Sequence, residues 1–497
     1  MLHGETQVRG NNPPKSQFHA RGRFGRLFPE LPAFADDTPV IRDALSKLGE
    51  RGGLMDANDP RGPGQPPLPT PPPPNVNEDN TTISAGFTFF GQFVDHDMTF
   101  DPTSILERQN DPEAIENFRT PSLELDNVYG SGPRVSRHLY DVTDPAKFLI
   151  ERTGGPGSAD DMPRNSQQTA LIADPRNDEN TIVSQLHVAM LKFHNAVVDR
   201  VRAKGTPEAQ VFEQAQRMVR WHYQWIVLNE FLPKTVGADV VQKVLNANPG
   251  HRIFKWKNEP FIPVEFSVAA YRFGHSQVRP GYRLNGVGPG GFAAGIFNSA
   301  LDPTAADPND LRGGKRAERR FVEWDLFFDI AGTTRRQLSK EIDTKISSPL
   351  HDLLVGPPGQ VGGSAPGTIA NPLSLAQRNL LRGLALGVPS GQAMARHIGV
   401  KVLTPAQLNE LRQFNVGFET STPAWYYILK EAEVMKNGTQ LGPLGGRIVA
   451  EVIIGVLQGD RFSFLNANPN WRPELGNDKG QFFIGDLLKI AGVRLGA

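Results

Sequence analysis

Three polar residues, Asp95, His96 and Asp97, stand at the end of a long apolar segment of this chain. The twelve residues before them, ISAGFTFFGQFV, contain no charged side chain. Such a run is too hydrophobic for a surface loop, so we expect a helix that carries the three polar residues into the interior. Buried charges need partners, and the fold must therefore bring ligating or oppositely charged groups to this segment.

Helical geometry separates these three side chains. Successive residues on a helix are rotated by roughly 100°, so Asp95 and Asp97 cannot face one pocket together with His96. Each carboxylate is therefore expected to serve a different neighbour. The pattern indicates an ion or a redox cofactor, and the simpler alternative is a hydrogen-bonded core histidine flanked by a cap and an ion pair.

Composition narrows the class of protein. The 497 residues include no cysteine, which excludes disulfides and thiolate ligands to a metal. The 53 basic and 53 acidic residues balance, so neither nucleic acid nor an anionic membrane is expected as a partner. The longest apolar stretch, 448–457, is interrupted by Glu451, so we expect a soluble protein without a membrane span. We also expect no signal peptide, and the protein would be either cytoplasmic or exported by a leaderless route.

The chain is divided by a proline-rich stretch. Proline and glycine dominate residues 60–77, a composition that favours extended polyproline conformation and opposes helix. We interpret residues 1–78 as an N-terminal extension with a Pro-rich arm and residues 79–497 as the catalytic domain. Phe24, Leu27 and Phe28 are apolar enough for the extension to wrap the core.

Beyond the extension the periodicity is helical. Apolar residues recur at spacings of three and four within 182–200 and 211–231, which predicts two buried helices. Residues 302–314 and 356–372 are rich in Gly, Pro and Asp and are expected to be loops. Strand signals are few, so the fold is expected to be mainly α with little β.

Three later segments each place two polar residues three positions apart. Residues with this spacing share one face of a helix or helical turn, so each pair can face a common pocket. A surface arginine with an unrelated neighbour is the alternative for any single pair. The pairs are Arg176 with Glu179, Arg272 with His275, and Asn379 with Arg382.

Together with the segment at 91–97, these motifs resemble the animal haem peroxidase family of the peroxidase–cyclooxygenase superfamily. Residues 91–97 resemble the distal-histidine helix, and 173–179 (ADPRNDE) resemble the element with the distal Arg and Glu. Residues 271–275 (YRFGH) resemble the proximal element, and 378–382 (RNLLR) its supporting helix. The resemblance implies a mainly α-helical fold with haem between central helices, and the lack of cysteine is typical of a bacterial-type member.

The resemblance also implies roles for these residues around haem b. His96 would be the acid–base catalyst and Arg176 the fixed cation, while Gln92 would help to hold water or a small anion above the iron. His275 would be the axial iron ligand. The remaining cofactor-binding residues are Asn379, which would hold the ring of that ligand, Arg272 and Arg382, which would pair with propionates, and Asp95 and Glu179, which could form ester links.

A calcium site is implied next to this centre. Asp97 would be joined by Thr120, Ser122, Glu124 and Asp126, which alternate in sequence and would face one side of an extended segment. Hard oxygen ligands of this kind suit Ca²⁺. The alternative is an acidic loop paired with Arg119 or Arg134.

The resemblance implies a peroxidase. It would reduce hydrogen peroxide and oxidise a small donor, such as a halide, thiocyanate or a phenolic compound, through a ferryl intermediate. One alternative is a haem-dependent fatty-acid dioxygenase, for which Tyr271 would be the candidate radical residue. Another is a non-haem metal-binding hydrolase or binding protein that uses Asp95, His96 and Asp97. The oligomeric state is left open.

Overall fold

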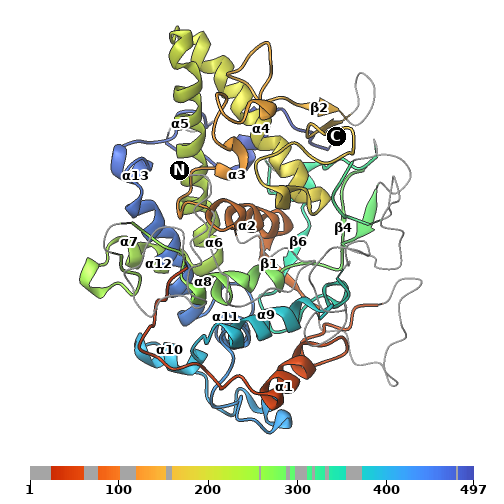
Figure 1. Cartoon of the computed structure of the whole chain (residues 1–497), viewed down its shortest axis with the longest axis vertical. Helices are drawn as coiled ribbons and strands as arrows, with labels where there is room; N and C mark the ends of the chain where they lie inside the picture. The colour runs from red at the N-terminus through yellow and green to blue at the C-terminus, as the bar shows by residue number, and fades with distance from the viewer. Residues whose placement is uncertain are drawn as a thin grey trace.

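The computed structural model describes most of the chain, and its described part is mainly α-helical (Figure 1). The described residues are 24–60, 77–100, 119–152, 159–256, 259–286, 292–296, 310–315, 319–330, 335–353, 372–476 and 480–496. The Pro-rich arm and most of the two predicted loops, at 301–309 and 354–371, lie outside these residues.

The α-helices in this part of the chain are α1 (Pro39–Gly49), α2 (Ala85–Met98), α3 (Asp126–Tyr129), α4 (Thr181–Ala203), α5 (Glu208–Ile226), α6 (Leu232–Val236), α7 (Ala238–Leu245), α8 (Val264–Ser267), α9 (Leu375–Ala385), α10 (Gly391–His397), α11 (Ala424–Lys436), α12 (Pro443–Gly459), α13 (Phe464–Ala467) and α14 (Ile484–Ile490). Short helical turns that carry site residues are η2 (Pro175–Asp178), η4 (Pro249–His251) and η5 (Ala270–His275).

The strands of the described residues form three two-stranded antiparallel sheets. They pair β1 (Asp79–Ser84) with β6 (Leu338–Lys340), β2 (Glu151–Arg152) with β3 (Asp160–Asp161), and β4 (Gly281–Arg283) with β5 (Ala293–Gly295). The expected class, mainly α with little β, is confirmed.

Helix α2 lies at the centre of the molecule, with α4 and α5 on one side and α9 and α11 on the other in Figure 1. Its buried aromatic residues pack against neighbours from distant segments, such as Phe87 on Phe328 and Phe90 on Phe231. Because α2 is buried on nearly all faces, the polar residues at its C-terminal end are enclosed by protein.

Helices α4 and α5 correspond to the two periodic segments. The side chain of Asn180 accepts hydrogen bonds from the amides of Ile182 and Val183, which begins α4 directly after the Arg176 motif. Helix α5 continues through a π-helical turn, Val227–Phe231, into α6. In the described residues, no helix combines the length and the apolar character that a bilayer span requires.

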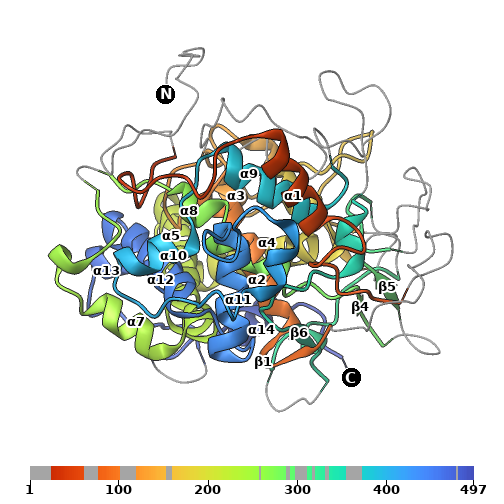
Figure 2. The same cartoon turned by 90° about the horizontal axis from the view of Figure 1, so that it is seen from below.

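The N-terminal segment packs against the core. Gly25 forms a parallel bridge with Pro263, and the backbone amides of Leu27 and Phe28 donate to the carboxylate of Glu265 at 2.9 and 3.2 Å. Farther along, α1 packs against α9 (Figure 2). Residues 24–60 therefore form part of the globular structure.

Replacing Glu265 with Ala is expected to loosen this segment. The carboxylate is completely buried, and its loss would leave two backbone amides without an acceptor, a cost of about 2 kcal/mol. Calorimetry should show a lower Tm, and limited proteolysis should cut within residues 24–60 sooner. The exposed Glu259→Ala variant is the control, and an equal effect of both would contradict the anchoring role.

Candidate active site

A cavity of about 290 Å³ lies beside α2 and contains nine of the predicted site residues. It is lined by groups from α2, η2, η5 and α9, which meet only in the folded chain. The predicted residues on its wall are Gln92, Asp95, His96, Arg176, Glu179, Arg272, His275, Asn379 and Arg382. Tyr271, Arg378 and Arg42 of the N-terminal segment also line it.

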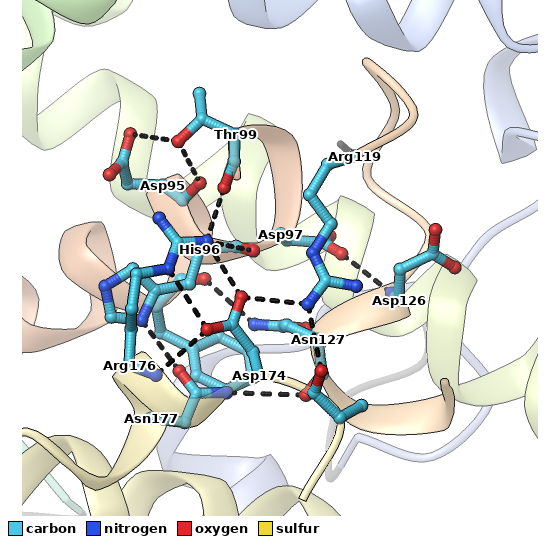
Figure 3. A network of polar contacts seen from close by, with 12 residues as sticks. Asp95, His96, Asp97, Thr99, Arg119, Asp126, Asn127, Asp174, Arg176 and Asn177 are labelled. Atoms are coloured by element: carbon cyan, nitrogen blue, oxygen red, sulfur yellow. Dashed lines mark hydrogen bonds and ion pairs between the residues drawn. The ribbon is translucent and has the colours of Figure 1, made fainter. Parts of the chain in front are cut away.

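The imidazole of His96 is held by an amide that the sequence motifs did not single out. Its Nδ1 lies 2.8 Å from Oδ1 of Asn177, and Nδ2 of Asn177 lies 3.0 Å from Nδ1 of His187 (Figure 3 shows His96 and Asn177). Because an amide oxygen only accepts, the proton of neutral His96 lies on Nδ1 and its Nε2 keeps a lone pair. Burial and the nearby Arg176 lower the pKa of His96 to about 3, so the ring is neutral at pH 7.

Arg176 is fixed by a buried carboxylate. Its Nε and Nη2 donate to the two oxygens of Asp174 at 3.0 and 2.8 Å, and Nη2 also donates to the backbone oxygens of His96 and Thr99. Asp174 accepts a further bond from Arg119 at 2.9 Å. Figure 3 shows the carboxylate between the two guanidiniums. Within the described residues Nη1 of Arg176 forms no hydrogen bond, so it is the donor left for the cavity.

The second cavity histidine, His275, is also held by an amide. Nδ2 of Asn379 lies 2.8 Å from its Nδ1, and Nη1 of Arg272 donates to Oδ1 of the same amide at 2.8 Å. A guanidinium only donates, so the amide must present its NH₂ group to the ring. Burial and Arg272 lower the pKa of His275 to about 3. The indole of Trp425 packs edge-on against this ring, with centroids 6.3 Å apart, and donates to the backbone oxygen of Arg272.

The polar groups at the edge of the cavity contact one another. Gln92 donates to Glu179 and accepts from Asn180, both at 3.2 Å, so both ends of its amide already have partners. Asp95 accepts from the hydroxyl of Thr99 at 3.2 Å, and burial raises its pKa. Asp95 and Glu179 therefore reach the cavity from two different elements, α2 and the end of η2.

Asp97 points away from the cavity. Its Oδ1 accepts from the backbone amide of Asp126 at 3.0 Å (Figure 3), while Oδ2 is buried without a hydrogen-bond partner among the described residues. The hydroxyl of Ser122 is likewise buried and unpaired there. Burial and Asp126 raise the pKa of Asp97, and burial and Glu124 raise that of Asp126 to about 7. Carboxyl groups thus lie together where the sequence predicted a cation, and their burial without one disfavours the charged forms.

The loop at 120–126 differs from the extended segment that we expected. The amide of Ser122 bonds to the oxygen of Thr120, and Leu125 adopts a left-handed backbone with φ of 62°. This conformation breaks the alternation, because successive side chains point to opposite sides only along an extended backbone. Thr120 is exposed, and the described residues contain no cluster of three Asp, Glu or His side chains at metal-binding distance.

Two residues of this site, Asp174 and Asn177, were not predicted from the sequence, although they lie within the motif at 173–179. Asp174 and Asn177 flank Arg176 in ADPRNDE, yet nothing in their spacing shows that they contact Arg119 or His96.

The alternative of a non-haem metal site formed by Asp95, His96 and Asp97 is not supported. These side chains contact three different partners: Thr99, Asn177 and Asp126. His187 has a structural partner in Asn177, as a core histidine would.

The fold and cavity define a mainly α-helical protein with two neutral histidines on the wall of one buried cavity. Solved structures share this fold. Peroxidase A from Dictyostelium discoideum aligns over 97% of this chain and 96% of its own, with a TM-score of 0.58 and 17% identity. A fatty acid alpha-dioxygenase from Oryza sativa aligns over 91% and 78%, with a TM-score of 0.56 and 13% identity.

Comparison of the sequence with known families is more specific than comparison of the fold. Residues 104–474 match the model of the animal haem peroxidase family, more than half of the chain, and the protein therefore belongs to this family. The match includes Arg176, His275 and Asn379 and begins after α2.

Relatives carry peroxidase names. Heme peroxidase 2 of Caenorhabditis elegans is 23% identical over 75% of this chain and 58% of its own length. Peroxinectin A of Dictyostelium discoideum is 26% identical over 67% and 60%, and mouse thyroid peroxidase is 22% identical over 72% and 39%. The chain thus spans less than two thirds of each of these relatives.

Replacing Asp174 with Asn should destabilise the protein by about 3 to 5 kcal/mol, because Arg176 would lose its buried counter-charge. The exposed pair Lys147 with Asp199 provides a control, and Asp199→Asn should cost less than about 1 kcal/mol. Denaturant unfolding at pH 7 measures both.

Asp174→Asn should also change how the free energy of unfolding depends on pH in the acid range. Burial opposes ionisation of Asp174, but Arg176 outweighs it and holds the pKa below the ordinary value. The stabilisation is therefore present above the ordinary pKa of Asp and is lost as the pH falls through the lowered value. Asp174→Asn should flatten this part of the profile, and an unchanged acid limb would contradict the assignment.

Proposed function

We propose that this protein is a haem peroxidase that reduces hydrogen peroxide and oxidises a small donor. The supporting observation is the pair of histidines, His96 and His275, on the wall of one cavity. Each has its Nδ1 held by an asparagine amide, and within the described residues neither Nε2 forms a hydrogen bond. Bound haem b would supply the iron at which peroxide is reduced, and His275 would be its axial ligand.

His96 is the proposed acid–base residue. Its neutral ring offers the lone pair of Nε2 to a proton of peroxide and can return that proton to the departing oxygen. Asn177 maintains the tautomer that this role needs, because its Oδ1 engages the Nδ1–H. The low pKa caused by burial keeps the base unprotonated through the neutral range.

Arg176 is the proposed fixed donor. Asp174 holds two of its nitrogens, so the side chain cannot turn away from the cavity, and Nη1 can meet negative charge as it develops on the oxygen atoms. The guanidinium stays charged whatever the state of the neighbouring histidine.

The proximal side requires one rearrangement. With the NH₂ group of Asn379 donated to Nδ1, the proton of neutral His275 lies on Nε2, the atom that would bind iron. Binding of iron through Nε2 would therefore require either the loss of that proton or a rotation of the Asn379 amide. The rotation would release Arg272 from Oδ1. A propionate is a suitable acceptor for that arginine, and Arg382 lines the same cavity.

Asp95 and Glu179 are the proposed sites of ester links to haem. Both carboxylates reach the cavity, from α2 and from the end of η2. Asn180 follows Glu179. The resemblance to the family implies Met at this position where a third, sulfonium link forms, so we favour a phenolic donor or thiocyanate over chloride.

A dioxygenase is the second candidate, because a solved dioxygenase shares the fold and Tyr271 lines the cavity. The phenol of Tyr271 donates to the backbone oxygen of Gly91 at 3.1 Å, and burial raises its pKa. This hydrogen bond ties η5 to α2, and a structural role explains it without a radical.

Haem reconstitution of the full chain tests the proposal. We expect a Soret band and peroxide-dependent oxidation of guaiacol. His275→Ala should alter the axial ligation seen in the spectrum, whereas His96→Ala should keep it and slow the peroxide reaction by about a hundredfold. The exposed His138→Ala variant should match the parent protein.

Two results would contradict the proposal. Unchanged ligation in His275→Ala would remove the proximal assignment. Oxygen consumption on unsaturated fatty acids, abolished by Tyr271→Phe, would establish the dioxygenase instead.

We further propose that Ca²⁺ binds next to α2. The buried Asp97 Oδ2 and Ser122 Oγ, unpaired among the described residues, are oxygen ligands of the kind that Ca²⁺ prefers. Asp126 and Glu124 would add charge, and Thr120 could join through its backbone oxygen. The loop is linked to His96, because Nδ2 of Asn177 donates to the backbone oxygen of Asn127 at 3.5 Å.

Removal of this ion should weaken the site that it adjoins. Chelation with EGTA should release about one calcium per chain, lower the Tm and slow the peroxide reaction. Asp97→Asn should reproduce these effects, whereas the exposed Asp239→Asn variant should not. Peroxide reactivity that survives loss of calcium would refute the coupling, and absence of calcium from the purified protein would refute the site.

A further inference from the structure

A second cavity of about 240 Å³ lies between the N-terminal segment, residues 251–255, α10 and α12. It shares no lining residue with the candidate active site. Its wall contains five basic side chains from three separate parts of the chain: His251, Arg252, Lys255, His397 and Arg447. None of the described residues that line it is acidic.

Arg252 is the unusual member of this group. Only 8% of its surface is exposed, and within the described residues it forms one hydrogen bond, from Nη2 to the backbone oxygen of Val244, and no ion pair. Burial lowers the pKa of Arg252 by more than the neighbouring carboxylate of Glu451 raises it. A buried cation of this kind is costly unless an anion accompanies it.

The nearby carboxylates are already engaged. Glu451 pairs with Arg447 at 2.7 Å and accepts from the amide of Phe254. Glu30 pairs with His397 at 3.1 Å. Lys255 is exposed and forms no hydrogen bond or ion pair in the described part of the chain, so it adds a second cation to that of Arg252.

The rest of the wall is apolar and consists of Leu27, Phe28, Ile253 and Ile398, of which only Ile253 and Ile398 keep an accessible surface, because Leu27 and Phe28 are each 1% exposed. Phe28 also packs edge-on against the ring of His397, with centroids 5.5 Å apart. A simple inorganic anion would satisfy the cations but leave this surface uncovered. A ligand with a charged head and a short apolar body would use both parts of the cavity.

We propose that this cavity binds an organic oxyanion, a carboxylate or phosphate monoester with a short apolar chain, with its head on Arg252 and Lys255. The guanidinium offers paired donors that suit the planar or tetrahedral oxygens of such a head. The apolar chain would lie against Ile253 and Ile398, the apolar residues of the wall that keep an accessible surface.

Calorimetric titration of the full chain tests the proposal with four probes: inorganic phosphate, octyl phosphate, octanoate and octanol. Octyl phosphate and octanoate should bind with one site per chain, about threefold more tightly than inorganic phosphate, because the chain covers the accessible apolar surface of Ile253 and Ile398. Octanol, which lacks the charge, should not bind measurably. The stronger of the two heads identifies the source, phosphate or carboxylate.

Variants separate the two halves of the cavity. Arg252→Gln, which can keep the bond to Val244, should weaken both charged amphiphiles by about tenfold or more. Lys255→Gln should weaken them by about threefold without changing the Tm of the free protein. Ile398→Ser should weaken octyl phosphate but leave inorganic phosphate unchanged.

Lys489→Gln on α14 is the matched control, an exposed lysine outside the cavity, and should bind as the parent protein does. Three outcomes would overturn the proposal: no binding of either amphiphile at millimolar concentration, equal losses in the control variant, or affinity that Arg252→Gln and Lys255→Gln leave unchanged. None of these outcomes depends on haem, so they are independent of the proposed peroxidase activity.

Discussion

The candidate active site depends on the buried carboxylate of Asp174. It accepts hydrogen bonds from both Arg176 and Arg119 and so provides a shared counter-charge between the two guanidiniums. Arg176 then reaches the C-terminal end of α2 by donating to the backbone oxygens of His96 and Thr99. Because breaking a buried ion pair leaves an uncompensated charge, Asp174 fixes the guanidinium of Arg176 in the position from which it contacts α2.

Three consecutive polar residues near the C-terminal end of α2 face three different parts of the protein. Asp95 faces the cavity, His96 meets Asn177 and Asp97 meets the amide of Asp126, as the 100° step between residues requires. The loop and the cavity are joined by a short chain of side-chain contacts, in which Asn127 bonds to Phe93 and Asn177 bonds to Asn127. These hydrogen bonds connect the residue that follows the loop with the amide that contacts His96.

The N-terminal segment joins the two cavities. Arg26 donates to the backbone oxygens of Leu386 and Gly387, and Leu386 lines the active-site cavity, while Leu27 and Phe28 line the basic one. Glu265 holds the segment between these points. A segment that is anchored by buried hydrogen bonds on both sides behaves as part of the core, although the sequence sets it apart by its proline-rich neighbour.

Local sequence patterns predicted those features of the protein that depend on the geometry of a single helix. The apolar run before Asp95 predicted a buried helix, the 3.6-residue periodicity predicted α4 and α5, and three-residue spacings predicted which polar residues share a face. These features depend on the geometry of one helix at a time. The nine residues that the family resemblance assigned to one site all line one cavity.

Tertiary structure decided the partners. Asn177 and Asp174 became positioning residues because η2 packs on α2, and the loop at 120–126 turned at Leu125 instead of remaining extended. Arg252 and His397 lie 145 positions apart and line one basic cavity only after folding. The sequence by itself therefore determined which side chains must be buried and which face they share. The fold alone decided what each meets, because contacts between distant segments depend on the packing of the whole chain.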